Sequence, residues 1–97
     1  MRWVVIFEDS PHMLLVRKEH EPAHFAYLKV HQNEILLAGG LREGDDAPFC
    51  GGLWVMAPMA KERAIALVES DPYFIHGKRS YQLLQWGKAF QDIAVTL

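Results

Sequence analysis

The sequence has little cysteine and no long apolar run, and each absence excludes a class of protein. A single cysteine, Cys50, among 97 residues cannot form an intramolecular disulfide and has no second thiol for a metal site. No apolar stretch approaches the ~20 residues of a membrane helix. The N-terminus reaches Glu8 and Asp9 before a signal peptide's apolar core is complete. We therefore expect a cytoplasmic protein that does not associate with a membrane.

The chain also lacks a concentration of basic residues and a cofactor motif. Ten Lys and Arg against twelve Asp and Glu give a net charge of −2, with no basic cluster long enough to follow a phosphate backbone. Nucleic acid is therefore not expected as a partner. Gly39 and Gly40 follow an apolar segment but lack the helix that a phosphate-binding loop requires, so a turn or bulge is their simpler use and no cofactor is indicated.

Apolar residues are abundant for a chain of this size. They make up 51% of the sequence, whereas a chain this short buries only about 60 to 70% of its unfolded surface. Residues 1–97 are long enough for one domain only. The surplus of apolar side chains indicates that a second copy of the chain covers part of the surface, which predicts a homodimer.

The apolar pattern predicts the order strand, helix, strand, strand, helix, strand. The strands are expected at residues 2–8, 34–41, 53–57 and 80–90, and the helices over residues 11–33 and from residue 60 onward. Two strand-helix-strand units of this length fit an α+β, ferredoxin-like βαββαβ fold, in which both helices cover one face of an antiparallel sheet.

The first strand is apolar on both faces. Trp3, Val5 and Phe7 point to one side, and Val4 and Ile6 to the other. Since the helices cover one face only, the same face of a second subunit is the simplest cover for the other. The pattern therefore predicts a two-fold dimer in which two sheets form an α/β barrel.

The first helix has a predicted start and a predicted interruption. Ser10 and Pro11 are typical of an N-cap and a first helical position. Pro22 predicts a kink or short break around residues 19–21, followed by a second segment that ends near Asn33. In that segment an apolar stripe is expected, with His24 and His31 on its flank; its members are Ala23, Ala26, Tyr27 and Val30.

In this topology the start of the first helix, the loop over residues 42–52 and the corner at residues 69–73 should lie close together. His24 and Asp71 could then form a pair. A carboxylate that accepts a hydrogen bond from one imidazole nitrogen leaves the other nitrogen to act as a general base or acid.

Simpler explanations exist for the same residues. Asp71 precedes Pro72 and could cap the turn that follows, while His24 could be an exposed helical residue or pair with Glu21. His20 and His24 have helical spacing, but Pro22 interrupts the regular helix that would bring them to one metal ion. Aromatic residues such as Tyr73 are also common core or dimer contacts.

Several segments together resemble the YciI-like (YCII-related) family. They are "RKEHEPAHFAYL" (17–28), "LLAGGL" (36–41), "GGLWVMA" (51–57) and "AIALVESDPYFIHG" (64–77), and the similarity covers nearly the whole chain. The resemblance implies a ferredoxin-like subunit in a dimeric α/β barrel, with an active site built on His24 and Asp71. Gly39, Gly40 and Tyr73 are then candidates for the pocket wall.

The family is similar to a dehydrochlorinase of a chlorinated hydroxyquinone, and its barrel to that of muconolactone isomerases. This implies proton transfer on a small enolisable or aromatic compound. Many relatives have Gly-Pro at positions 39 and 40, where this chain has two glycines, so the identity of the substrate does not carry over. Two classes of function remain open: an acid–base enzyme, and a non-catalytic ligand-binding or structural homodimer.

Overall fold

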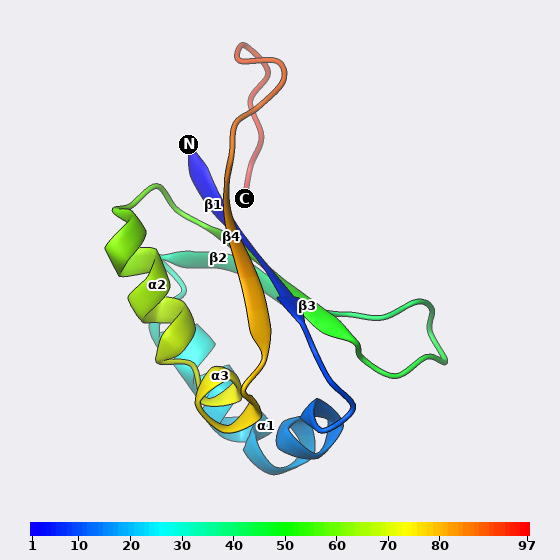
Figure 1. Cartoon of the computed structure of the whole chain (residues 1–97). Coiled ribbons are helices and arrows are strands. Elements are labelled where there is room, and N and C mark those ends of the chain that lie inside the picture. The colour runs from blue at the N-terminus through cyan, green and yellow to red at the C-terminus, as the bar shows by residue number, and fades with distance from the viewer.

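Four antiparallel strands form one sheet in the order β2-β3-β1-β4, and helices cover one of its faces (Figure 1). The computed structural model describes all residues from 1 to 97. The strands are β1 (Arg2–Glu8), β2 (Ile35–Leu41), β3 (Gly51–Met56) and β4 (Ser80–Trp86), and the helices are α1 (Met13–Val30), α2 (Lys61–Glu69) and α3 (Pro72–Gly77). This is the βαββαβ topology of the ferredoxin-like fold, which confirms the predicted fold class.

The core lies between the sheet and the helices because alternate strand residues point to that side. Trp3, Val5 and Phe7 of β1 are buried there. From α2 the core receives three fully buried residues, Ala64, Leu67 and Val68. The period of two in β1 and the period of 3.6 in α2 thus bring two apolar surfaces together.

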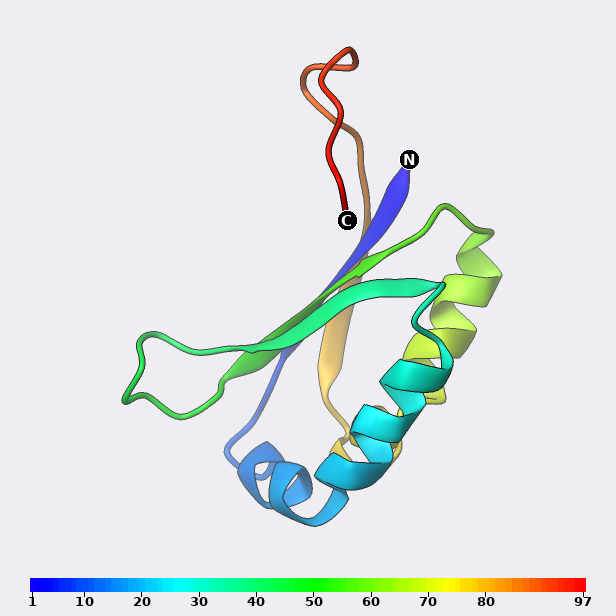
Figure 2. The same ribbon diagram turned by 180° about the vertical axis from the view of Figure 1, so that it is seen from behind.

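The opposite face of the sheet is also apolar, and no helix covers it (Figures 1 and 2). Val4 lies opposite Leu84 of β4 in the strand register, so both point to this face. Four large side chains of β1, β2 and β4 are exposed: Ile6, Leu37, Leu84 and Trp86. The predicted division of β1 into two apolar faces is confirmed, and one of them faces solvent in the single chain.

The first helix differs from the prediction at its start and at Pro22. α1 begins at Met13 rather than after Ser10, because residues 10–12 form a turn in which the Ser10 carbonyl accepts the Met13 N–H at 3.0 Å. No side chain caps this end. Pro22 lies inside one continuous helix, whose ribbon bends partway along (Figure 2). The loss of one backbone hydrogen bond at Pro22 allows a kink without ending the helix, so a kink is present and the alternative of a break is wrong.

The predicted apolar stripe on α1 was wrong. Val30 is 77% exposed, Ala23 and Ala26 are exposed, and only Tyr27 of that set is partly buried. The helix instead turns its His24 side inward, because it packs against α3 as well as against the core on the sheet, through Tyr27 and Leu28. A polar residue therefore occupies the most buried position in this half of the helix.

The last strand is shorter than predicted. β4 ends at Trp86, whereas the pattern had placed the strand over residues 80–90. Residues 87–97 form no helix or strand, and their ribbon extends away from the sheet (Figure 1). Phe90 is 67% exposed there, so most of its side chain is not packed within a single chain. No helix of the chain has the length and apolar character needed to cross a membrane.

Tyr27 connects α1 to α2. Its hydroxyl donates a 2.6 Å hydrogen bond to the carbonyl oxygen of Leu67. Burial, and next the charge of Asp71, raise the pKa of Tyr27 to about 12. The phenol is therefore a neutral donor at neutral pH, and this bond helps to hold the two helices in register.

Replacement of Tyr27 by Phe should destabilise the fold by about 1 kcal/mol, because the phenyl ring keeps the packing and loses only the hydrogen bond. Urea denaturation would measure the change. A matched control is Tyr81→Phe, which removes an exposed hydroxyl bonded to Glu69 and should cost less. Equal stability of Tyr27→Phe and the unmodified protein would contradict the expectation.

Candidate active site

A cavity of about 180 Å³ lies between α1, the sheet and α3. Its wall includes residues from all of these elements: Arg17 and His24 of α1, Gly39 and Gly40 of β2, Tyr73 of α3, and Arg79 just before β4. Phe49 and Gly52 also border it. The predicted meeting of the start of the first helix, the loop over residues 42–52 and the corner at residues 69–73 is therefore found. The three residues proposed for the pocket wall from the sequence all border this cavity.

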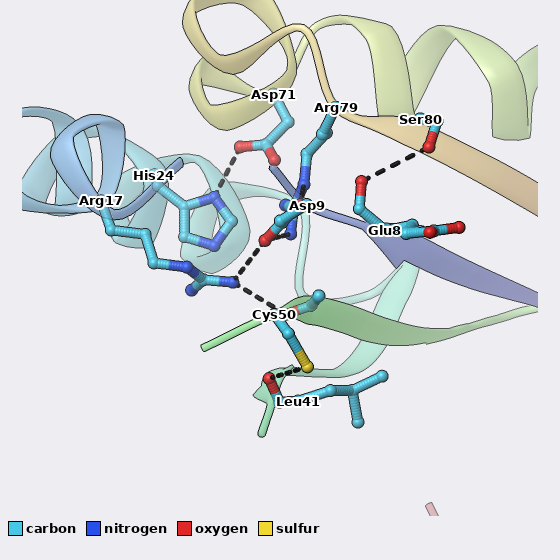
Figure 3. A network of polar contacts seen from close by, with 10 residues as sticks. Glu8, Asp9, Arg17, His24, Leu41, Cys50, Asp71, Arg79 and Ser80 are labelled. Atoms are coloured by element: carbon cyan, nitrogen blue, oxygen red, sulfur yellow. Dashed lines mark hydrogen bonds and ion pairs between the residues drawn. The ribbon is translucent and has the colours of Figure 1, made fainter. Parts of the chain in front are cut away.

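His24 and Asp71 form a buried hydrogen-bonded pair (Figure 3). Nδ1 of His24 lies 2.6 Å from Oδ1 of Asp71, and the side chains are only 8% and 0% exposed. Because a carboxylate only accepts hydrogen bonds, Nδ1 carries the proton in this pair. Nε2 of His24 has no hydrogen-bond partner in the protein, and the residue borders the cavity. The free ring nitrogen is therefore the one available to a ligand.

Asp71 occupies the N-cap position of α3, yet its side chain makes no capping hydrogen bond. The carbonyl oxygen of Asp71 accepts the N–H groups of Phe74 and Ile75 instead. Its second carboxylate oxygen, Oδ2, is buried and has no partner. The alternative of a side-chain cap is therefore wrong, and the only hydrogen bond of this carboxylate goes to His24.

Tyr73 fixes the plane of the His24 ring. The two rings stack with centroids 3.7 Å apart and an angle of 7° between their planes. Burial is the main cause that raises the pKa of Tyr73, so the phenol remains neutral near pH 7. With Asp71 on one nitrogen and Tyr73 against one face, the imidazole has little freedom to rotate.

A second charged cluster lies beside this pair (Figure 3). Asp9, whose side chain is fully buried, accepts two hydrogen bonds from Arg79, at 2.7 and 3.0 Å. Nη2 of Arg17 adds a third contact at 3.1 Å and also donates to the carbonyl oxygen of Gly51 at 2.8 Å. One carboxylate thus holds two guanidinium groups at the cavity wall.

Phe49 covers the guanidinium of Arg17, and Gly40 leaves room for it. The Arg17 Cζ atom lies 4.7 Å from the centre of the Phe49 ring. A Cβ atom at position 40 would lie 2.6 Å from the Phe49 ring and 3.3 Å from Nη1 of Arg17. A larger residue at position 40 would therefore displace part of the cavity wall.

Asp9, Arg17 and Arg79 were not predicted from the sequence. Arg17 and His24 are two helical turns apart and share a face of α1, a spacing that could have connected them. Asp9 follows β1 and Arg79 precedes β4, and the pairing of Glu8 with Ser80 places them opposite each other. The proximity of Asp9 and Arg79 therefore follows only from the strand register.

The remaining histidines lie outside the pair. His31 lies 3.8 Å from Glu34 at the end of α1, and His20 stacks on His76 with ring centroids 3.8 Å apart. No group of three or more His, Cys, Asp or Glu side chains is arranged to hold a metal ion. Cys50 is exposed in the loop before β3.

Comparisons with known proteins agree with this architecture. The profile of the YCII-related domain matches residues 1–87. Among solved structures, the chain is similar to 5-chloro-2-hydroxyhydroquinone dehydrochlorinase (TftG) from Burkholderia phenoliruptrix AC1100, in complex with 2,5-dihydroxybenzoquinone. The TM-score is 0.76, the identity is 22%, and the match covers 90% of this chain and 94% of that one. At this identity the likeness shows a shared fold. Among curated proteins, no sequence matches significantly.

Replacement of Asp9 by Asn should destabilise the protein by about 3 to 5 kcal/mol, because it leaves two guanidinium groups without their shared buried counter-charge. The free energy of unfolding in urea measures this loss. The same substitution at Asp45, which is exposed in the loop before β3, should leave stability nearly unchanged. A loss of less than about 1 kcal/mol in Asp9→Asn, the range of an exposed pair, would contradict a structural role for Asp9.

Proposed function

The chain belongs to the YCII-related family, and we propose that it is a small-molecule enzyme in which His24 and Asp71 carry out general acid–base catalysis. The reaction is proton transfer on a small enolisable or aromatic compound. The observation that carries this proposal is the 2.6 Å contact between His24 and Asp71 at the wall of a cavity. A buried carboxylate devoted to one histidine, with no capping role, is an arrangement that packing alone does not require.

The chemistry follows from the two nitrogens of the imidazole. Nδ1–H donates to Asp71, so Nε2 carries the lone pair and can accept a proton from a compound in the cavity. The ring then becomes an imidazolium, whose charge the Asp71 carboxylate stabilises. The same nitrogen can return the proton to another atom of the compound. An isomerisation or the loss of a leaving group would both begin with this transfer.

The size of the cavity limits the compound. A volume of about 180 Å³ is slightly larger than the ~150 Å³ cavity that accommodates benzene in an engineered protein. A single six-membered ring with a few substituents is therefore the expected size. The wall offers Phe49, Trp54 and Tyr73 as apolar surface for such a ring.

The similar solved structure indicates which compounds to test first. By its description, TftG is a dehydrochlorinase of a hydroxyhydroquinone and was solved with 2,5-dihydroxybenzoquinone. That compound is a single ring with oxygens that permit keto–enol exchange, which agrees with the size limit above. It serves here as a probe for a shared type of chemistry rather than as an assigned substrate.

Proton transfer can be measured without a known product, as the incorporation of deuterium from D₂O into ring C–H positions followed by NMR. A panel of single-ring hydroxyquinones and enolisable ketones would be tested. His24→Asn should lower the rate by about 10²- to 10⁴-fold, because it removes the base. Asp71→Asn should fold like the unmodified protein and also lose rate, since an amide supports an imidazolium poorly.

Glu69→Gln is the matched control, because Glu69 is exposed, bonds to Tyr81 and does not border the cavity. It should exchange deuterium at the rate of the unmodified protein. Exchange that is undiminished in folded His24→Asn would refute the acid–base role. Binding of ring compounds without any exchange would favour a ligand-binding protein instead.

We further propose that the chain functions as a homodimer, joined through the uncovered face of the sheet. The exposed residues Leu37, Leu84 and Trp86 lie on this face, and a contiguous apolar area of this kind marks an interface in soluble proteins. A two-fold axis would pack the face against its own copy. The arrangement leaves α1 and α3, and with them His24 and Asp71, on the outer side of each sheet.

Light scattering at micromolar concentration should therefore give the mass of a dimer. Leu84→Glu should shift the protein toward monomer, because it places a charge in the interface. Leu15→Glu is the control: Leu15 lies on α1 and, like Leu84, is 50% exposed. A monomeric unmodified protein, or equal effects of the two substitutions, would refute this interface.

A further inference from the structure

The cavity that holds His24 is also lined by two guanidinium groups, those of Arg17 and Arg79. Neither Asp9 nor Asp71 borders it, since both carboxylates are fully buried behind the wall. Glu21 is the one acidic residue at the cavity, and its side chain is exposed to solvent, where its charge is screened. The enclosed part of the cavity therefore presents positive charge.

The guanidinium groups of the two arginines differ in the hydrogen bonds that they make within the protein. Arg79 bonds Asp9 through both Nε and Nη2, and its side chain is only 2% exposed. Arg17 uses Nη2 alone, for one contact to Asp9 and one to the Gly51 carbonyl. Since Asp9 carries one negative charge and Arg79 already pairs with it in bidentate form, Arg17 is the cation without a counter-charge of its own.

Nη1 is the unused donor of Arg17 that lies at the cavity. Nε also has no hydrogen-bond partner, but it is buried behind the wall. No protein acceptor bonds Nη1, and this atom lies next to Gly40 in the wall: a Cβ at position 40 would be 3.3 Å away. Phe49 and Tyr73 flank the guanidinium, with Cζ 4.7 and 5.3 Å from their ring centres. The flanking rings limit the rotation of the group, so its free donors keep one direction.

We propose that Arg17 binds an oxyanion on the ligand, and that the ligand class is a single-ring organic anion with its charge on oxygen: a carboxylate, phenolate or enolate. The oxyanion accepts hydrogen bonds from the N–H groups of Nη1, and the ring packs on the aromatic wall. A charge-assisted hydrogen bond of this type is stronger than a neutral one, and guanidinium is the side chain best suited to carboxylate and enolate oxygens.

This inference rests on the proposed function, because both place the ligand in the same cavity. It adds a reason why the proton transfer is favourable there. When Nε2 of His24 removes a proton from an enolisable ring, the electron pair of the broken bond moves onto a ring oxygen. A fixed cation beside that oxygen stabilises the charge as it forms.

Benzoate and benzamide provide the test, because they have nearly the same shape and differ in charge. Calorimetric titration at pH 7 and fixed ionic strength should show benzoate binding about tenfold tighter or more, the usual advantage of one charge-assisted hydrogen bond. Arg17→Gln should reduce the preference to about twofold or less, while Arg63→Gln, far from the cavity in a pair with Glu34, should keep it.

His24→Asn separates this inference from the acid–base proposal, since it should lose proton transfer and still prefer benzoate. Loss of the preference in His24→Asn but not in Arg17→Gln would overturn the assignment to Arg17. So would equal binding of the two compounds, or binding of neither, to the unmodified protein.

A second measurement on the unmodified protein covers the case in which Arg17→Gln fails to fold. With ¹⁵N-labelled arginine, benzoate should shift the Nε–H resonance of Arg17 and leave that of Arg63 in place, and benzamide should shift neither. An unmoved Arg17 resonance at saturating benzoate would overturn the proposal.

Discussion

The buried carboxylate of Asp9 is the constraint on which the arrangement of the site depends. It lies at the end of β1, receives Arg79 from the start of β4, and receives Arg17 from α1. Two like charges would not remain side by side in the interior without it. Since Arg17 and His24 lie on the same helix, holding Arg17 also positions His24 opposite Asp71. The charge at Asp9 thus connects the sheet to the helix that carries the candidate base.

All buried side-chain polar atoms that lack a hydrogen-bond partner lie at the site. Only two buried side-chain atoms lack a hydrogen-bond partner, Nε of Arg17 and Oδ2 of Asp71. Buried polar groups without partners cost stability, so most proteins avoid them. Both atoms belong to the two charged clusters around one small cavity. Their location beside the cavity agrees with selection for function at some expense of stability.

The proposed chemistry needs a proton acceptor and a positive charge, and two different groups provide them. The His24–Asp71 contact supplies a nitrogen that can accept or return a proton, and Arg17 supplies a cation where negative charge would appear. Tyr73 touches both groups, by stacking on the imidazole and by flanking the guanidinium. A single short helix, α3, therefore places Asp71 and Tyr73 together, and the Asp-Pro-Tyr sequence at its start explains why they are adjacent.

Local patterns in the sequence determined the strands, the second helix and the two apolar faces of β1, because periods of two and 3.6 report which side of an element is buried. The same patterns, with a family resemblance, singled out His24 and Asp71. They failed for the buried side of α1, where a histidine turns inward and Val30 faces solvent. They also missed Asp9, Arg17 and Arg79. Those side chains meet only through the register of β1 with β4 and the docking of α1, and such long-range geometry leaves no period in the sequence.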